Sequence, residues 1–241
     1  SGERAALARL EAFVATGLRG YAAARREPAL DASARLSPYL RFGQISPRQI
    51  VRRVRASDAP ATDVTAFLDE LVVRRELAAN YTWYEPRYGH FGGLPSWAQQ
   101  TLLEHAGDQR SVVVSEAQIE AGETGDPYFD AAMRELRSCG VIHNIARMYW
   151  GKQILAWLPD PRRARAFAQQ LNDRYALDGR SPNGFANVAW CFGLHDRPWP
   201  ERAVFGKVRA MTFNSSGRKI DLPSYIARVA ALERAAAGSG L

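Results

Sequence analysis

Signals that start helices recur along this chain, and they constrain its fold more than any other feature. A residue that can cap a helix stands directly before a proline at Ser37-Pro38, Ser46-Pro47 and Asp126-Pro127. The capping side chain accepts a hydrogen bond from a free amide of the first turn, and proline is favoured at the first helical position. The period-2 alternation that is typical of strands does not occur. The sequence therefore predicts an all-α fold.

The expected helices follow one another closely in a single domain that covers residues 1–241. Apolar residues with helical spacing predict helices at residues 3–26, 61–83, 115–121, 126–138, 141–158 and 161–175. A further helix is expected to end near Ala106, after an aromatic and glycine-bearing loop at residues 84–97. No repeat or linker divides the chain, and its last residues, 235–241, are expected to be frayed.

The composition excludes several classes of protein. With 46% hydrophobic and 24% charged residues, the chain is typical of a soluble globular protein. Its apolar runs are far shorter than the ~20 residues that span a bilayer, and no leader opens it, so we expect a cytoplasmic protein without membrane contact. We expect Cys139 and Cys191 to be reduced thiols. The four histidines lack metal-ligand spacing, so no metal is expected.

The positive charge of the chain is a hint about its partner. The formal net charge is +7 and the pI is about 9.7, and arginines cluster at residues 48–55, 162–165 and 202–218. Such a surface attracts a polyanion such as nucleic acid, chiefly through phosphate contacts. The alternative is an arginine-rich surface that is solvated and binds nothing.

A dense polar stretch at residues 172–184 is the main candidate site. It contains Asn172, Asp178, Arg180 and Asn183 together with two glycines, and Trp190 follows shortly after. These residue types suit a pocket that hydrogen-bonds a large polar cofactor and offers one flat aromatic surface to a second planar partner. A surface loop without a ligand has a similar composition, so both interpretations stay open on residue types alone.

Five stretches of the sequence, taken in order, resemble one known family. They are residues 34–46, 70–77, 147–152, 172–184 and 193–199. They are similar to the C-terminal FAD-binding domain of class II cyclobutane pyrimidine dimer photolyases, in the photolyase/cryptochrome superfamily. The family's N-terminal α/β antenna domain has no counterpart in this sequence. The chain would therefore be a truncation, a fragment or a stand-alone domain, with the antenna domain separate or removed.

The resemblance implies a reaction and a set of cofactor contacts. Light-excited, fully reduced FAD would pass an electron to a pyrimidine dimer flipped out of DNA, and the protein would bind, orient and tune the cofactor without a metal. The FAD pyrophosphate would lie at a helix N-terminus, which favours anions. The implied cofactor-binding residues are Tyr21, Ser33, Leu36, Ser37, Arg75, Asn144, Arg147, Asn172, Asp178, Arg180 and Asn183.

Individual roles also follow from the resemblance. Arg147 and Asp178 would form an ion pair along the flavin, and Asn172 would face its N5 atom. Arg75 would lie beneath the cofactor, with an ordinary surface salt bridge as the alternative. Ser37 would also cap its helix, and the two roles are compatible.

The same resemblance places the dimer across the cofactor. The implied catalytic residues are Glu70, Asn172, Met148 and Trp190, and the implied substrate contacts are Glu70, Arg74 and Trp190. Trp190 would stack on a flipped base, and Glu70 would hydrogen-bond the dimer. Arg74 occupies a position where some relatives have tryptophan. Taken singly, Met148 and Trp190 have the character of core residues.

The expected route for photoreduction of the cofactor is incomplete. Trp150 and Trp157 lie seven residues apart on one helix and resemble the two ends of the family's tryptophan chain. The family's middle tryptophan is replaced by Phe129, which is much harder to oxidise. We therefore expect slow photoreduction. The alternative is that all three residues are core aromatics.

Two other functions stay open. A cryptochrome-like flavoprotein would bind FAD without repairing DNA, and the changes at Arg74 and Phe129 favour it. An all-α nucleic-acid-binding protein without a cofactor would leave the polar stretch at residues 172–184 without a purpose. The sequence indicates no oligomeric state.

Overall fold

The computed structural model describes residues 1–238, and their side chains as far as Ala235. Helices and loops make up this part of the chain, which contains no strand, and one isolated antiparallel bridge joins Arg202 and Gly206. The all-α prediction is confirmed. The α-helices are α1 (Glu3–Thr16), α2 (Tyr21–Ala24), α3 (Ser37–Arg41), α4 (Pro47–Arg55), α5 (Ala61–Leu68), α6 (Arg75–Tyr84), α7 (Ser96–Glu104), α8 (Glu116–Ala121), α9 (Pro127–Cys139), α10 (Asn144–Trp157), α11 (Pro161–Tyr175), α12 (Pro182–Cys191), α13 (Phe213–Gly217) and α14 (Leu222–Gly238).

Most predicted caps form as expected. Ser46 accepts a hydrogen bond from the amide of Arg48, Asp126 accepts from the amides of Tyr128 and Phe129, and Ser115 forms a capping box with Gln118. The prediction that Ser37 caps its helix is wrong. Leu36 is the N-cap of α3 and makes no side-chain cap, so Ser37 is already the first helical residue.

The helix expected at residues 3–26 is divided in two. Gly17 follows α1, and Gly20 adopts a φ of 84°, which interrupts the helix before α2. The carboxylate of Asp63 on α5 then accepts the amides of Gly20 and Ala22, each at 2.8 Å. A long-range acceptor therefore fixes α2 and with it Tyr21, which periodicity alone could not show.

The helix expected at residues 61–83 is continuous but not uniformly α-helical. A π-helical segment, η2 (Asp69–Arg74), joins α5 to α6. Such a segment widens the helix locally and is frequent at functional sites. It carries Glu70 and Arg74, two of the residues that the sequence assigned to the substrate.

Several other expectations need correction near the C-terminal half. No helix was predicted at α12, α13 or α14, and the helix expected from residue 141 begins at Asn144. The expected fraying from residue 235 is wrong as far as Gly238, because α14 extends to that residue. Residues 239–241 lie outside the described part of the chain.

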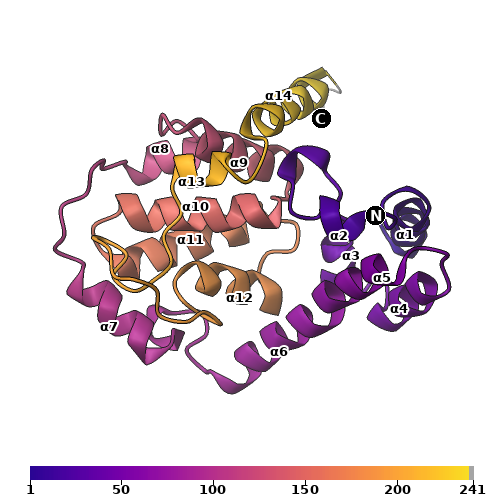
Figure 1. Cartoon of the computed structure of the whole chain (residues 1–241), viewed down its shortest axis with the longest axis horizontal. Coiled ribbons are helices and arrows are strands. Elements are labelled where there is room, and N and C mark those ends of the chain that lie inside the picture. The colour runs from indigo at the N-terminus through magenta and orange to yellow at the C-terminus, as the bar shows by residue number, and fades with distance from the viewer. Residues whose placement is uncertain (239–241) are drawn as a thin grey trace.

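The helices form two lobes (Figure 1), and each lobe has its own cluster of buried apolar residues. The small lobe contains α1–α5, and the large lobe contains α6–α14. Helix α10 is the centre of the large lobe, where ten of its fourteen residues are buried and it packs against α9, α11 and α12. A Cβ atom on Gly151 of α10 would lie 2.5 Å from the Sγ of Cys191 on α12, so glycine permits the close packing of these helices. Both cysteines are free.

Candidate functional site

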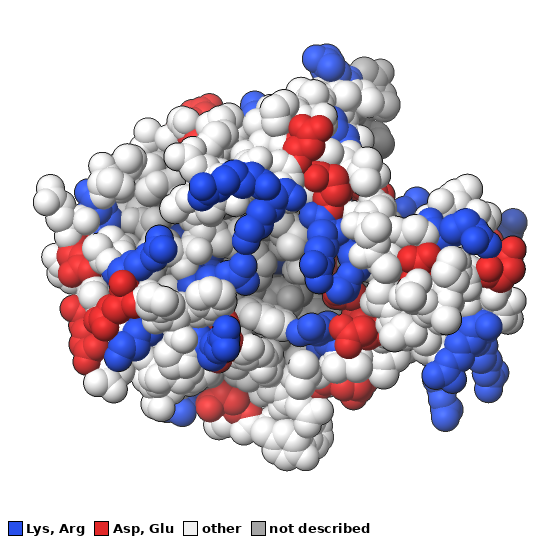
Figure 2. Space-filling model, in the orientation of Figure 1, with Lys and Arg blue, Asp and Glu red and all other residues white. Residues whose placement is uncertain are grey.

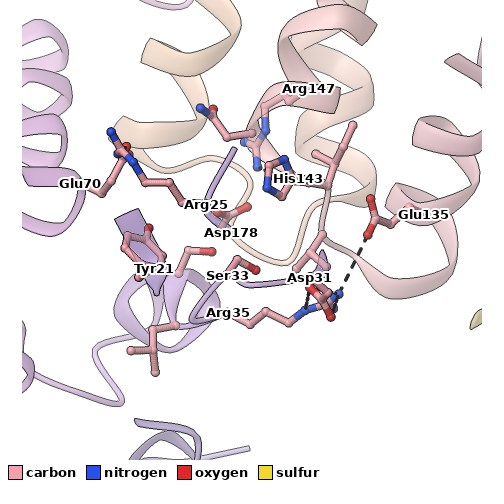
Figure 3. A pocket seen from close by; sticks show the side chains of 15 residues that line it. Tyr21, Arg25, Asp31, Ser33, Arg35, Glu70, Glu135, His143, Arg147 and Asp178 are labelled. Atoms are coloured by element: carbon pink, nitrogen blue, oxygen red, sulfur yellow. Dashed lines mark hydrogen bonds and ion pairs between the residues drawn. The ribbon is translucent and has the colours of Figure 1, made fainter. Parts of the chain in front are cut away.

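A pocket of about 230 Å³ lies between the two lobes. Figure 3 shows Tyr21 and Ser33 of the small lobe facing His143 and Arg147 of the large lobe across it. Eight of the residues that the sequence predicted for the site line this pocket, and they come from five separate segments. These residues are Tyr21, Ser33, Leu36, Ser37, Glu70, Asn144, Arg147 and Asp178.

One end of the pocket is suited to phosphate. Ser33, Leu36 and Ser37 lie at the N-terminal end of α3, whose first amides receive no side-chain cap. Arg35 lies beside them, with a φ of 51°, and its guanidinium donates to both carboxylate oxygens of Asp31. Burial raises the pKa of Tyr21 to about 12, so its hydroxyl stays protonated and can donate a hydrogen bond.

The pocket contains an ion pair that the sequence did not predict. Arg25, directly after α2, contacts the carboxylate of Glu70 on η2. Arg25 lies four residues after Tyr21, on the same side of a helix, and this spacing is the sequence signal that could have identified it. Glu70 therefore faces the pocket already paired with a cation, and its expected contact with a dimer stays a prediction.

Two nitrogens of Arg147 are buried without partners, and the carboxylate of Asp178 lines the pocket without a hydrogen bond. Arg147 is 8% exposed, and its Nη2 makes one long hydrogen bond of 3.5 Å to the carbonyl of Ile142. Its Nε and Nη1 atoms are buried with no hydrogen bond. The carboxylate of Asp178, also buried, makes no hydrogen bond within the described chain, and the expected direct ion pair between the two residues is not formed. Because unpaired buried polar groups are costly, these residues fit a polar ligand between the lobes.

Asn172 is fixed by the turn after α11 rather than by the pocket surface. It is buried, its Nδ2 lies 3.3 Å from Oδ1 of Asp173, and a Cβ on Gly184 would lie 3.0 Å from that Nδ2. The same Oδ1 accepts the amide of Arg180, whose φ is 55°. Asp173, which the sequence did not single out, therefore organises this turn.

The remaining predicted cofactor residues lie outside the pocket lining. Arg180 is exposed, whereas Arg75 and Asn183 are half-buried. Arg75 forms no ion pair in the described part of the chain, so its alternative as a surface salt bridge is not supported. The cofactor roles of Arg75, Asn172, Arg180 and Asn183 stay predictions.

A second surface gathers around Trp190 at the end of α12. The guanidinium carbon of Arg74 lies 5.2 Å from the centre of the Trp190 ring, and the His195 ring meets it edge-on at 5.5 Å. The Sδ of Met148 lies 3.9 Å from the Sγ of Cys191 beside Trp190. Arg74 therefore covers one face of the indole. A base that stacks on Trp190 would have to use the other face or displace Arg74.

The expected electron-transfer residues Trp150 and Trp157 are buried aromatics of the core. Trp150 is 1% exposed, and its Nε1 donates to the Sδ of Met133 at 3.4 Å. The ring of Phe129, fully buried, packs edge-on against Trp157 at 4.8 Å. Phe129 thus lies directly beside Trp157, and its effect on photoreduction stays a prediction.

Other kinds of site are not found in the described residues. No group of three or more His, Cys, Asp or Glu side chains there could hold a metal ion. No described helix is both long and apolar enough to cross a bilayer.

Comparison with known proteins connects this arrangement to one family. The family model described as the FAD binding domain of DNA photolyase matches residues 67–201, more than half of the chain. The chain is similar to a deoxyribodipyrimidine photo-lyase of Methanothermobacter thermautotrophicus, with 45% identity over 231 residues that cover 96% of the chain and 51% of the relative. A rice protein of the same name is 40% identical over 95% of the chain and 46% of the relative. The chain thus spans about half the length of these curated relatives.

Solved structures share the fold. A class III photolyase from Agrobacterium tumefaciens superposes with a TM-score of 0.75 at 24% identity, over 95% of this chain and 45% of the other. A cryptochrome from Synechocystis gives a TM-score of 0.67 at 20% identity, over 94% of this chain and 44% of the other. At such identities the similarity shows the fold alone, and it agrees with the helical architecture described above.

Proposed function

Because the chain belongs to the family of FAD-binding domains of DNA photolyases, we propose that it repairs cyclobutane pyrimidine dimers in DNA by light-driven electron transfer. The observation that carries this proposal is the pocket between the lobes, where Nε and Nη1 of Arg147 are buried without a partner and Asp178 lines the wall without a hydrogen bond to its carboxylate. FAD fits this donor set, because it offers hydrogen-bond acceptors and donors on its ring and anionic oxygens on its phosphates. When bound in reduced form, FAD supplies the electron that splits the dimer.

Different residues of the pocket would bind the phosphates and the ring of the cofactor. The amides at the start of α3, with Ser33 and Ser37, would bind the phosphates. Arg147 and Asp178 would hydrogen-bond the ring from the large lobe, and Asn172 would orient its amide toward N5. The closed helix packing around α10 would exclude water from the ring. No metal is part of the proposed site.

The subtype that we propose is the class II dimer photolyase. Its support is the order and spacing of the five sequence stretches that resemble that class. In this proposal the antenna domain is a separate chain or has been removed. The protein acts in the cytoplasm, where free thiols such as those of Cys139 and Cys191 persist.

The surface near the pocket supports DNA as the partner. A second cavity, of about 1000 Å³, is lined by five cationic side chains, none of which has an ion-pair partner within the described chain. No carboxylate residue is among the described residues that line it. Figure 2 shows Lys and Arg side chains gathered over the middle of this face. The cations are Arg26, Arg202, Arg209, Arg218 and Lys219.

The dimer would bind beside Trp190. Stacking of a flipped base on an aromatic ring is worth roughly 1–3 kcal/mol, which offsets part of the cost of unstacking it from DNA. Glu70 would donate or accept a hydrogen bond at the dimer after exchanging its contact with Arg25. Arg74, displaced from the indole face, would become available to a phosphate.

One experiment tests the proposal. The purified chain is loaded with FAD, reduced chemically, and illuminated with blue light in the presence of DNA that contains pyrimidine dimers, with a dark sample as control. We expect dimers to disappear only in the light. Bound flavin without loss of dimers would support the cryptochrome-like alternative and overturn repair. A protein that binds no flavin would overturn both.

A further inference from the structure

The segment that follows α12 is a basic loop without regular structure. This loop, residues 196–209, carries four of the chain's cations and Trp199, and it lines the large basic cavity. It folds back on itself through two backbone hydrogen bonds between Arg202 and Gly206, at 3.0 and 2.7 Å. The guanidinium carbons of Arg197 and Arg209 lie 5.7 and 5.1 Å from the centre of the Trp199 ring. A loop of this kind needs an anchor to present its cations in one arrangement.

The anchor is the C-terminal end of α7. The amide of Lys207 donates to Thr101 at 3.0 Å, and the amide of Val204 donates to Oδ2 of Asp108 at 2.8 Å. Gly206 packs so closely on α7 that a Cβ there would lie 2.8 Å from Cδ2 of His105. The loop and α7 are about a hundred residues apart in sequence, so only the tertiary structure brings them together.

His105 lies at the centre of this anchor, between two carboxylates. Its Nδ1 is 2.6 Å from Oδ2 of Asp108, and its Nε2 is 2.8 Å from Oε1 of Glu201 in the loop. Ionised carboxylates only accept hydrogen bonds, and a neutral imidazole has only one N–H to donate. The two contacts together therefore require the doubly protonated imidazolium.

We propose that protonated His105 is a positioning residue that clamps the basic loop against α7, so that the loop presents its cations to the DNA backbone, and that loss of this proton loosens the loop. The DNA step rests on the proposed function, whereas the clamp itself does not. Because the Glu201 contact needs the second N–H, deprotonation removes the direct link between His105 and the loop. Within the described chain, the loop is then held to this anchor only by the hydrogen bonds of the Val204 and Lys207 amides, which are expected to open more often.

The direction of the pH effect follows from the charges around His105. The hydrogen bonds to Asp108 and Glu201 raise the pKa of His105 above its ordinary value, and these two carboxylates are the charged groups that face its ring from both packed segments. The stabilisation that protonated His105 gives to the folded loop is therefore complete below the pKa of an unfolded histidine. It is lost as pH rises through the raised pKa of His105. The pKa of Asp108 is lowered, mainly by the hydrogen bond from the Val204 amide and to a smaller extent by His105. The stabilisation of the loop by the Asp108 carboxylate is therefore lost only in acid.

Hydrogen exchange tests the clamp on the flavin-loaded protein without DNA. The protection factors of the Val204 and Lys207 amides, corrected for intrinsic exchange, are measured from about pH 6 to about pH 9. We expect them to fall about tenfold in wild type as pH rises, and to be low and independent of pH in His105→Gln. The control is His90→Gln, because His90 is exposed and makes no ion pair in the described chain. A flat wild-type profile, or an unchanged profile in His105→Gln, would overturn the clamp.

A second measurement tests the positioning role. We expect His105→Gln to bind a DNA duplex several-fold more weakly than wild type at low pH, with the difference vanishing at high pH where both loops are loose. Equal affinity at low pH, together with altered exchange, would overturn the role in DNA binding. A wild-type protein that shows the exchange profile but binds no DNA would refute the proposed function and leave the clamp intact.

Discussion

Replacement of Arg147 by methionine is expected to stabilise the flavin-free protein and to weaken flavin binding. In the free chain the Nε and Nη1 atoms of Arg147 are buried and unpaired, and Nη2 makes a single bond of 3.5 Å to the Ile142 carbonyl. Each buried, unpaired donor costs roughly 1–3 kcal/mol. Methionine keeps the flexible apolar stem of arginine and removes the unpaired donors.

The size of the expected change in unfolding free energy follows from the two unpaired nitrogens of Arg147. Together they cost about 2–6 kcal/mol, and the lost packing of the guanidinium offsets most of the gain on removing them. We expect a net stabilisation of roughly 1–2 kcal/mol, which raises the Tm by about 2–8 °C in a domain of this size. In the flavin complex the same donors would be paired. Loss of one such bond to a charged group is worth roughly 1.5–3 kcal/mol, so the Kd for FAD should rise about 10–150-fold.

Thermal unfolding of the flavin-free and flavin-loaded forms, with a flavin titration, measures both effects. The control is Arg165→Met, because Arg165 is also buried and only its Nε lacks a partner, whereas its terminal nitrogens donate to the Tyr88 carbonyl at 2.9 Å and to Gln169 at 3.3 Å. This control should lower the Tm of both forms. A lower Tm for flavin-free Arg147→Met with unchanged flavin affinity would refute the idea that the Arg147 guanidinium is reserved for a ligand.

Three further predictions concern other parts of the molecule. Phe129→Trp should speed photoreduction of oxidised FAD under blue light with thiol present, because an oxidisable ring would then lie against Trp157; equal rates in both proteins would contradict this. Trp190→Ala should weaken binding of dimer-containing DNA about 5–150-fold in a titration and leave the flavin spectrum unchanged, since one stacking surface is lost. Gly151→Ala should lower stability by roughly 1–3 kcal/mol in a denaturant titration, because its Cβ would lie 2.5 Å from the Cys191 sulfur. Gly107→Ala, which meets no atom within 4 Å, is the control and should leave stability nearly unchanged.

The helix starts that the sequence predicted correctly are those that local interactions determine. Where a capping residue, a proline and an apolar repeat coincide, as at Asp126, local interactions determine the start of the helix, and the structure confirms it. Helix α12 was missed because its first turn, which begins at Pro182, lies inside the polar stretch that suggested a loop. The break at Gly20 was missed because the acceptor that fixes it, Asp63, lies about forty residues away.

In the candidate site, too, the sequence identified residues but not their long-range partners. Tyr21, Ser37, Glu70, Arg147 and Asp178 could be assigned from the sequence because their motifs are specific, and the structure brings all of them to one pocket. Their pairing could not be assigned. The structure pairs Glu70 with Arg25 and leaves Arg147 without the expected carboxylate partner.

By itself the sequence determined the helical class, the family resemblance and about half of the residues that line the pocket, because caps, periodicity and motifs are local. Only the tertiary structure decided which charges meet. It placed Arg74 over Trp190 and His105 between two carboxylates. The energy of a charged group depends on its burial and on partners that are distant in sequence, and both arise only when the helices pack.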